Sequence, residues 1–170
     1  VDDLLHLSRI EGGSLNMTIE KINLDHIVES TILNLEQEAL KKSIKIESLV
    51  DKRIEVLSDF ISLDIIISNY LNNALAYSPN NSKILITAEE VDEKIKLSVK
   101  DEGEGIPENY KDRVFERFFR VDKGRSLNQG GTGLGLSIVK NLASTLSCTV
   151  GVENLEPKGA SFWIELDKST

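Results

Sequence analysis

The segment GGTGLGLSIVK, residues 130–140, has glycine at 130, 131, 133 and 135 and then continues directly into an apolar helical pattern. Glycine in or near a helix is less favourable than alanine by roughly 1 kcal/mol, so four together indicate a close approach of the backbone to another group. Free N–H groups and the positive end of the helix dipole would suit an anion there. A flexible surface loop before an ordinary helix explains this segment alone equally well.

Two common phosphate-binding loops do not fit this segment. The P-loop requires G-x-x-x-x-G-K-[ST], and the chain contains no Gly-Lys-Ser or Gly-Lys-Thr. A dinucleotide fingerprint requires G-x-G-x-x-G after a strand. Here the run from Gly131 ends in Leu136 and follows a polar loop. The glycines therefore predict a site of another kind.

Composition narrows the functional classes. The chain has 170 residues, enough for one domain with a core, and its net charge of −8 argues against a nucleic-acid-binding surface. No apolar run approaches the ~20 residues that span a bilayer, and no signal peptide is visible. One cysteine, Cys148, cannot form an internal disulfide, which fits a reducing, cytoplasmic setting. Because the chain opens at Val1, already inside a helical pattern, we expect it to be part of a longer protein.

The order of helical and alternating patterns predicts the fold class. Apolar spacing predicts helices over 23–42, between Asp59 and Ser78, over 132–146, and a short one near 114–119. Alternation predicts strands over 44–50, 54–57, 84–91, 94–100, 149–153 and 160–166, with a further short strand near 17–22. Ser58–Asp59 offers an N-cap, and Asp92-Glu93 joins a hairpin. These elements predict an α+β sandwich in which helices cover one face of a mixed sheet.

A second glycine pair lies in DEGEGIP, residues 101–107, at the carboxyl end of an alternating strand. Asp101 can project from that rigid strand into a cleft. A carboxylate only accepts hydrogen bonds, so it would suit the exocyclic amine of adenine and repel the carbonyl of guanine. Gly103 and Gly105 would keep Cβ atoms away from a base or sugar. The simpler alternative is an acidic, glycine-rich turn.

The helix sequence NYLNNALAY carries Asn69, Asn73 and Tyr77 at a spacing of four, beside its apolar stripe. A polar stripe of this kind is usually just solvated. Asparagine is a poor helix former, however, so three within five residues are costly. An asparagine oxygen can ligate a Mg²⁺ that keeps its waters and phosphate oxygens.

The segment RVFERFFRVDKGR, residues 113–125, holds five cations against two acids in a chain that is acidic overall. Its three phenylalanines can pin one end of the following loop, which leaves the arginines free to reach a phosphate. The alternative is a surface helix with ordinary ion pairs, which contribute little.

In this order the four segments resemble the ATP-binding domain of sensor histidine kinases, a branch of the superfamily shared with gyrase, mismatch-repair and heat-shock chaperone ATPases. NYLNNALAYSP is similar to the N box, DEGEGIP to the G1 box, FERFFR to the F box and GGTGLGL to the G2 box. KGASF, residues 158–162, is similar to the glycine-containing segment at which the family's last strand begins, with Ala160 where threonine is usual. The resemblance implies a mixed five-stranded sheet covered by three helices, after an N-terminal helix remnant.

The resemblance also implies roles for single residues. Asn69, Asn73 and Arg120 would take part in catalysis, with Asn73 on Mg²⁺, Asn69 near the phosphates and Arg120 facing the γ-phosphate. Tyr77 would lie on the adenine and Asp101 would bind its amine. The remaining residues expected to line bound ATP are Gly103, Gly105, Ile106, Gly131, Thr132, Gly133, Leu134, Gly135 and Leu136.

The first residues, VDDLLHLSRIEGG, resemble the tail of the second helix in the family's dimerisation hairpin. We expect residues 1–14 to end that hairpin and residues 15–170 to form the ATP-binding domain, with an ATP lid over about 115–132. Neither His6 nor His26 lies in an acceptor motif, so both are expected to be surface residues. The phosphate acceptor would be a histidine of the upstream dimerisation domain, and a response regulator would be a further partner. We expect this fragment to be a monomer, the full-length protein a homodimer, and any membrane contact to come from upstream regions.

Three functions remain open at this point. The first is transfer of the γ-phosphate from Mg·ATP to a protein histidine. The second is a gyrase- or chaperone-like ATPase, but the glutamate that activates water in those relatives is replaced by Asn69. The third is a nucleotide-binding relay without catalysis, which is suggested by Ala76, where the family commonly has a cation. Ser62 in place of a frequent arginine, and Leu146-Ser147-Cys148 in place of His-Gly-Gly, are further departures.

Overall fold

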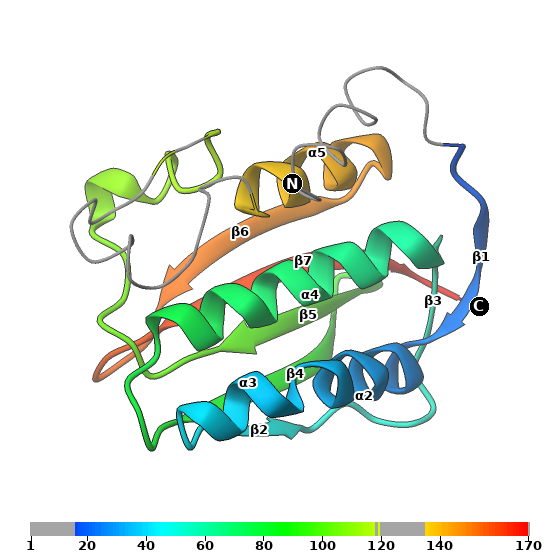
Figure 1. The fold of residues 1–170 in the computed structure, drawn as a ribbon. Helices are drawn as coiled ribbons and strands as arrows, with labels where there is room; N and C mark the ends of the chain where they lie inside the picture. Colours follow the sequence, from blue (N-terminus) through cyan, green and yellow to red (C-terminus); the bar gives the residue numbers. More distant parts are fainter. Residues whose placement is uncertain (1–15, 118, 120–134, 170) are drawn as a thin grey trace.

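The computed structural model describes residues 16–117, 119 and 135–169 (Figure 1). Its strands are β1 (Ile19–Asn23), β2 (Lys45–Ser48), β3 (Glu55–Asp59), β4 (Lys83–Val91), β5 (Lys94–Lys100), β6 (Thr149–Asn154) and β7 (Ala160–Lys168). Its helices are α2 (Leu24–Asn34), α3 (Glu36–Lys41), α4 (Phe60–Tyr77) and α5 (Gly135–Thr145), with a 3₁₀ turn at Glu108–Tyr110. These elements form an α+β sandwich, as the sequence predicts.

The sheet is mixed and open, with the order β1-β3-β7-β5-β4-β2 and with β6 also paired to β7. All pairs are antiparallel except β2 with β4. The sheet has seven strands, one for each alternating segment of the sequence, so the five-stranded sheet implied by the family resemblance is wrong. The length of β7 explains the difference: Ala160–Glu165 pair with β6, while Asp167 and Lys168 extend far enough to pair with β3 and so attach β1 as well.

The helices lie together on one face of the sheet, with α4 across the centre between α5 and the α2–α3 pair (Figure 1). The described residues contain four α-helices rather than three. The helix expected over 23–42 divides at Leu35, whose backbone (φ −104°, ψ 7°) leaves the helical region directly after Asn34, a weak helix former. The short helix expected near 114–119 is also wrong: turns follow the 3₁₀ turn through Arg117. The expected N-terminal helix remnant lies outside the described residues.

The core forms between α4 and the sheet. The predicted apolar stripe of α4 is buried in full: Leu63, Ile66, Ile67, Tyr70, Leu71 and Ala74. The Tyr70 hydroxyl, inside this core, donates a 2.8 Å hydrogen bond to the carbonyl of Trp163, which ties α4 to β7. Phe115 packs edge-on against Phe162, with 6.2 Å between ring centroids, so one of the predicted phenylalanine anchors does reach the core.

The ends of α4 are fixed as the sequence predicts. Asp59 is the N-cap, and its carboxylate accepts hydrogen bonds from the Ser62 backbone N–H (2.9 Å), the Ser62 hydroxyl (2.7 Å) and the Thr18 N–H (2.8 Å). The helix ends at Tyr77, after which Ser78 is extended. None of the helices in the described part of the chain is long and apolar enough to cross a membrane.

Candidate functional site

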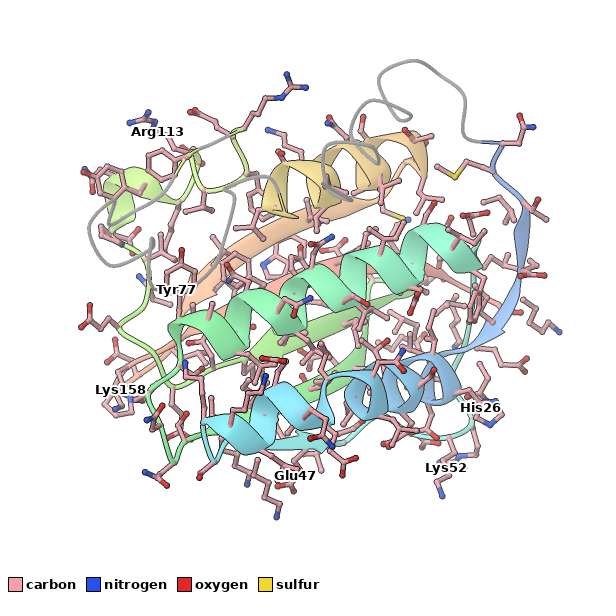
Figure 2. The ribbon with its side chains drawn as sticks, in the orientation of Figure 1. His26, Glu47, Lys52, Tyr77, Arg113 and Lys158 are labelled. Carbon is pink, nitrogen blue, oxygen red and sulfur yellow. The ribbon has the colours of Figure 1, made fainter. Side chains whose placement is uncertain are left out.

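The asparagine stripe of α4 lies beside its buried stripe. Asn69 and Asn73 are half-buried and Tyr77 is exposed. Since a helix rises 1.5 Å per residue, Asn69 and Tyr77 are about 12 Å apart along the axis. Figure 2 shows Tyr77 at the end of α4, at the same side of the molecule as Arg113 and Lys158. The stripe therefore leads from the middle of the helix layer to this end of the molecule.

Asp101 follows β5 and is 5% exposed. Its Oδ1 accepts hydrogen bonds from the backbone N–H groups of Gly103 (2.9 Å) and Ala160 (3.1 Å). Burial raises the pKa of the Asp101 carboxyl, although these two hydrogen bonds act in the opposite direction. Among the described residues, no hydrogen bond reaches Oδ2. The carboxylate is thus held by one oxygen while the other can accept from a ligand.

Gly103 brings the Asp101 loop against the end of α4. A Cβ at position 103 would lie 2.8 Å from the Tyr77 carbonyl oxygen and 3.2 Å from Asp101 Oδ1. Real Cβ atoms do not approach backbone oxygen so closely, so only glycine allows this contact. The contact joins the base-binding residues expected from two distant segments, Tyr77 and Asp101, into one local unit.

Asn154 at the end of β6 holds the next part of the same loop. Its Oδ1 accepts from the Ile106 N–H (2.8 Å), and its Nδ2 donates to the Ile106 carbonyl (2.7 Å). Gly105 has a φ of +82°, and a Cβ there would meet the Asn154 side chain at 2.8 Å. This two-point clamp fixes the loop that carries Gly103, Gly105 and Ile106.

The start of α5 lies against the asparagine stripe. A Cβ on Gly135, the first residue of α5, would lie 3.0 Å from Asn69 Oδ1. Leu136 follows, partly buried against the core. The Asn69 amide Nδ2 donates to the Ile65 carbonyl of its own helix (3.0 Å), which orients the Asn69 oxygen. Gly135, the first residue of α5, and Asn69 of the N box are therefore neighbours in space.

Several predicted site residues lie outside the described part of the chain. These are Arg120, Gly131, Thr132, Gly133 and Leu134, together with most of the expected lid. A groove of about 520 Å³ lies between α2, α3 and β2, and a cleft of about 330 Å³ lies along β6. Neither is lined by Asn69, Asn73 or Asp101.

The structure adds two residues to the site that sequence reasoning did not assign to it. Asn154 is one, and no local pattern marks it. Gly159 is the other: its φ is +106°, and a Cβ there would lie 2.1 Å from the Asp101 carbonyl oxygen. The sequence did mark Gly159, because it belongs to the KGASF segment that resembles the start of the family's last strand. His26 is exposed and lies at the opposite end of the molecule from Tyr77, as Figure 2 shows, so it is a surface residue as expected.

Comparison with known proteins agrees with this arrangement. Residues 58–170, more than half of the chain, match the family described as "Histidine kinase-, DNA gyrase B-, and HSP90-like ATPase". The chain belongs to this family. Among similar curated proteins, the sensor-like histidine kinase SenX3 of Mycolicibacterium smegmatis is 34% identical over 166 residues, which cover 98% of this chain and 43% of SenX3. The sensor histidine kinase WalK of Bacillus subtilis is 33% identical over 168 residues, covering 98% of this chain and 28% of WalK.

Solved structures of histidine kinases are also similar to this chain. ShkA full-length in complex with AMPPNP has a TM-score of 0.85 at 27% identity, covering 99% of this chain and 35% of ShkA. The catalytic domain of histidine kinase ThkA has a TM-score of 0.79 at 28% identity, covering 89% of this chain and 97% of that domain. The chain is therefore a catalytic ATP-binding domain of the sensor histidine kinase type, and it spans less than half the length of the curated relatives named above.

Proposed function

We propose that this domain binds Mg·ATP and donates the γ-phosphate to a histidine on a dimerisation domain of the same protein. The observation that carries the proposal is the contact between Gly135 and Asn69. It places the positive end of an 11-residue helix beside the asparagine stripe. Backbone N–H groups, an amide and a helix dipole at one place suit a triphosphate.

The base would bind at the Tyr77–Asp101 end. Oδ2 of Asp101 would accept a hydrogen bond from the adenine amine, while Tyr77 covers the ring. Gly103, Gly105 and Ile106 would line this part of the site, held by Asn154 and Gly159. The close contacts around Gly103 support this assignment, because they build a rigid wall with the carboxylate at its edge.

The triphosphate would lie toward Asn69. We assign the Mg²⁺ ligand to the Asn73 oxygen, because none of the hydrogen bonds in the described part of the chain uses the Asn73 amide and a neutral oxygen adds no repulsion toward phosphate. A bound Mg²⁺ neutralises phosphate charge. Arg120 would face the γ-phosphate, and residues 131–136, from the end of the lid to the start of α5, would supply backbone N–H groups.

Transfer is favoured over hydrolysis by the side chain at position 69. An amide cannot take a proton from water near neutral pH, and the Asn69 nitrogen is already bound to the Ile65 carbonyl. Position 69 therefore offers positioning and charge stabilisation, but it does not offer a base for water. The nucleophile would be the imidazole of the partner domain.

The wider assembly follows from this role. We propose a homodimeric full-length protein, a response regulator that receives the phosphate, and a cytoplasmic position for this domain. The response regulator is supported by the solved complex of histidine kinase ThkA with the response regulator protein TrrA. That structure has a TM-score of 0.78 at 25% identity and covers 98% of this chain and 47% of ThkA.

Substitution of Asn73 tests the metal site. We expect Asn73→Ala to abolish the Mg²⁺ dependence of ATP binding, measured by calorimetry with and without Mg²⁺, because the amide oxygen is the proposed ligand. Asn72→Ala is the matched control, since Asn72 is exposed on the same turn and the gain in helix propensity is the same. An unchanged metal titration in Asn73→Ala would mean that the metal is held elsewhere.

Transfer is tested by adding the histidine-bearing hairpin of the parent protein to the chain with [γ-³²P]ATP. Label on the hairpin that depends on Mg²⁺ supports the kinase. Release of free phosphate without the hairpin would indicate an ATPase, and binding without either reaction would indicate a relay. Either of these results would overturn the proposed transfer.

A further inference from the structure

The C-terminal end of α4 is held by a cation from another helix. Lys42 is the residue directly after α3, and its Nζ donates to the carbonyl oxygens of Leu75 (2.5 Å), Ser78 (2.7 Å) and, less closely, Ala76 (3.4 Å). The last turn of α4 contains no basic residue of its own. Lys42 therefore satisfies carbonyls that would otherwise lack a partner at this helix end.

The backbone of Lys42 holds the same turn. Its carbonyl accepts a 3.0 Å hydrogen bond from the N–H of Asn81, in the loop between α4 and β4. Three residues on, the N–H of Lys45 donates to the Ser82 carbonyl (3.1 Å), where β2 begins to pair with β4. One residue thus fixes both the end of α4 and the loop that leaves it.

This helix end forms one wall of the proposed base site. Tyr77 lies between the residues whose carbonyls Lys42 binds, and the Tyr77 carbonyl is the group against which Gly103 packs. Gly103 in turn donates to Asp101 Oδ1. A continuous chain of contacts therefore runs from the Lys42 ammonium group through the end of α4 to the carboxylate.

We infer that Lys42 is a positioning residue for the adenine-binding end of the site. By fixing the last turn of α4, it sets where Tyr77 lies relative to Asp101. This inference rests on the proposed function, because it assigns the base to that end.

The surroundings of Lys42 agree with a positioning role. Its side chain is half-buried, and burial lowers the pKa of its ammonium group. Among the described residues its side-chain partners are all carbonyl oxygens, and no carboxylate pairs with it. The three donors of the ammonium group match the three carbonyl oxygens, an arrangement that methionine, a neutral side chain of similar length, cannot reproduce.

The experiment compares Lys42→Met with Lys41→Met. Lys41 is the neighbouring residue. Its side chain is 69% exposed and, within the described part of the chain, pairs only with Glu38, so its loss leaves the end of α4 intact. Binding of Mg·ATP and of inorganic triphosphate with Mg²⁺ is measured by calorimetry below the unfolding temperature of each variant. We expect Lys42→Met to weaken Mg·ATP by roughly three- to thirtyfold, the range for residues that act through others, and to leave triphosphate binding within about twofold. Lys42→Arg should recover part of the loss, and Lys41→Met should match the wild type.

Each other outcome has a definite meaning. A lower melting temperature with unchanged ATP affinity would make Lys42 structural only and overturn the inference. Equal losses for ATP and triphosphate would overturn it too, because the effect would not be confined to the base end. If Lys42→Met does not fold, Lys42→Gln replaces it with the same expectations. A wild-type chain that fails to bind Mg·ATP would refute the proposed function itself, before any variant is compared.

Discussion

Substitution of Asp101 by asparagine separates the structural role of the side chain from its proposed binding role. An asparagine oxygen can still accept from the N–H groups of Gly103 and Ala160, now at 2.9 and 3.1 Å from Oδ1. The other atom changes from an acceptor to an NH₂ donor, which would face the amine of adenine. A hydrogen bond to a charged group contributes about 1.5–3 kcal/mol, so the loss corresponds to roughly 10- to 150-fold in ATP affinity.

The same substitution should leave the fold intact. Burial raises the pKa of the Asp101 carboxyl, which means that folding favours the neutral form and that the charge costs stability at neutral pH. An amide carries no charge, so we expect the free energy of unfolding to stay the same or rise, within about 1 kcal/mol. Chemical denaturation with urea measures this difference.

The assay is calorimetric titration of the wild type and the variant with Mg·ATP and with Mg·GTP. Asp92→Asn serves as the control, because Asp92 lies in the exposed β4–β5 turn at a φ of +50°, a conformation that asparagine adopts readily. We expect ATP to bind the wild type better than GTP, and Asp101→Asn to lose that preference. Equal affinities in the wild type, or unchanged ATP affinity in the variant, would refute the role of the carboxylate.

Two further predictions concern stability. Gly159→Ala should lower the free energy of unfolding by about 1–3 kcal/mol in urea denaturation, because its Cβ would meet the Asp101 carbonyl oxygen at 2.1 Å and its φ is +106°; an unchanged midpoint would contradict the packing. Burial raises the pKa of Asp59, but the hydrogen bonds that it accepts outweigh this effect and lower the pKa below the usual carboxyl value. Asp59 therefore adds stability at a pH above the usual carboxyl pKa and loses it as the pH falls through the lowered pKa. The stability gap between the wild type and Asp59→Asn, measured in thermal melts, should be largest near neutral pH and should narrow as the pH falls below the usual carboxyl pKa. A gap that is constant with pH would exclude the charge as its cause.

Local signals in the sequence were sufficient for the elements that carry the site. The Asp59 cap predicted the start of α4 and the turn sequence from Ser78 predicted its end, and all six predicted core positions of the helix are buried. Alternation and the Asp92-Glu93 pair predicted the β4–β5 hairpin, whose turn residues both have positive φ. These features depend on neighbours within a few residues, so a single sequence contains them.

Features that depend on distant partners were not predictable in this way. Local alternation marked all seven strands, but it did not predict their order, because the pairing of β3 with the last residues of β7 joins segments more than a hundred residues apart. The hydrogen bonds of Asn154 join it to Ile106, 48 residues away in the sequence, and those of Lys42 join it to Leu75, 33 residues away. Each uses an ordinary polar residue with no local pattern, and only the folded sheet brings the partners together.

Under the proposed function, the choice between phosphate transfer and ATP hydrolysis depends on the side chain at position 69 rather than on the fold as a whole. The scaffold that brings Gly135 against Asn69 would serve an ATPase equally well, because positioning a triphosphate needs only N–H groups, an amide and a metal ligand. Position 69 has no group that can take a proton from water, because Asn69 carries an amide. The amide nitrogen of Asn69 donates its hydrogen bond to the Ile65 carbonyl. A neutral imidazole needs no such base, so the histidine of the proposed partner domain would react at this site more readily than water. Under the proposed function, the reaction of this domain therefore depends on a second domain that supplies the attacking nitrogen, while this fold positions the triphosphate.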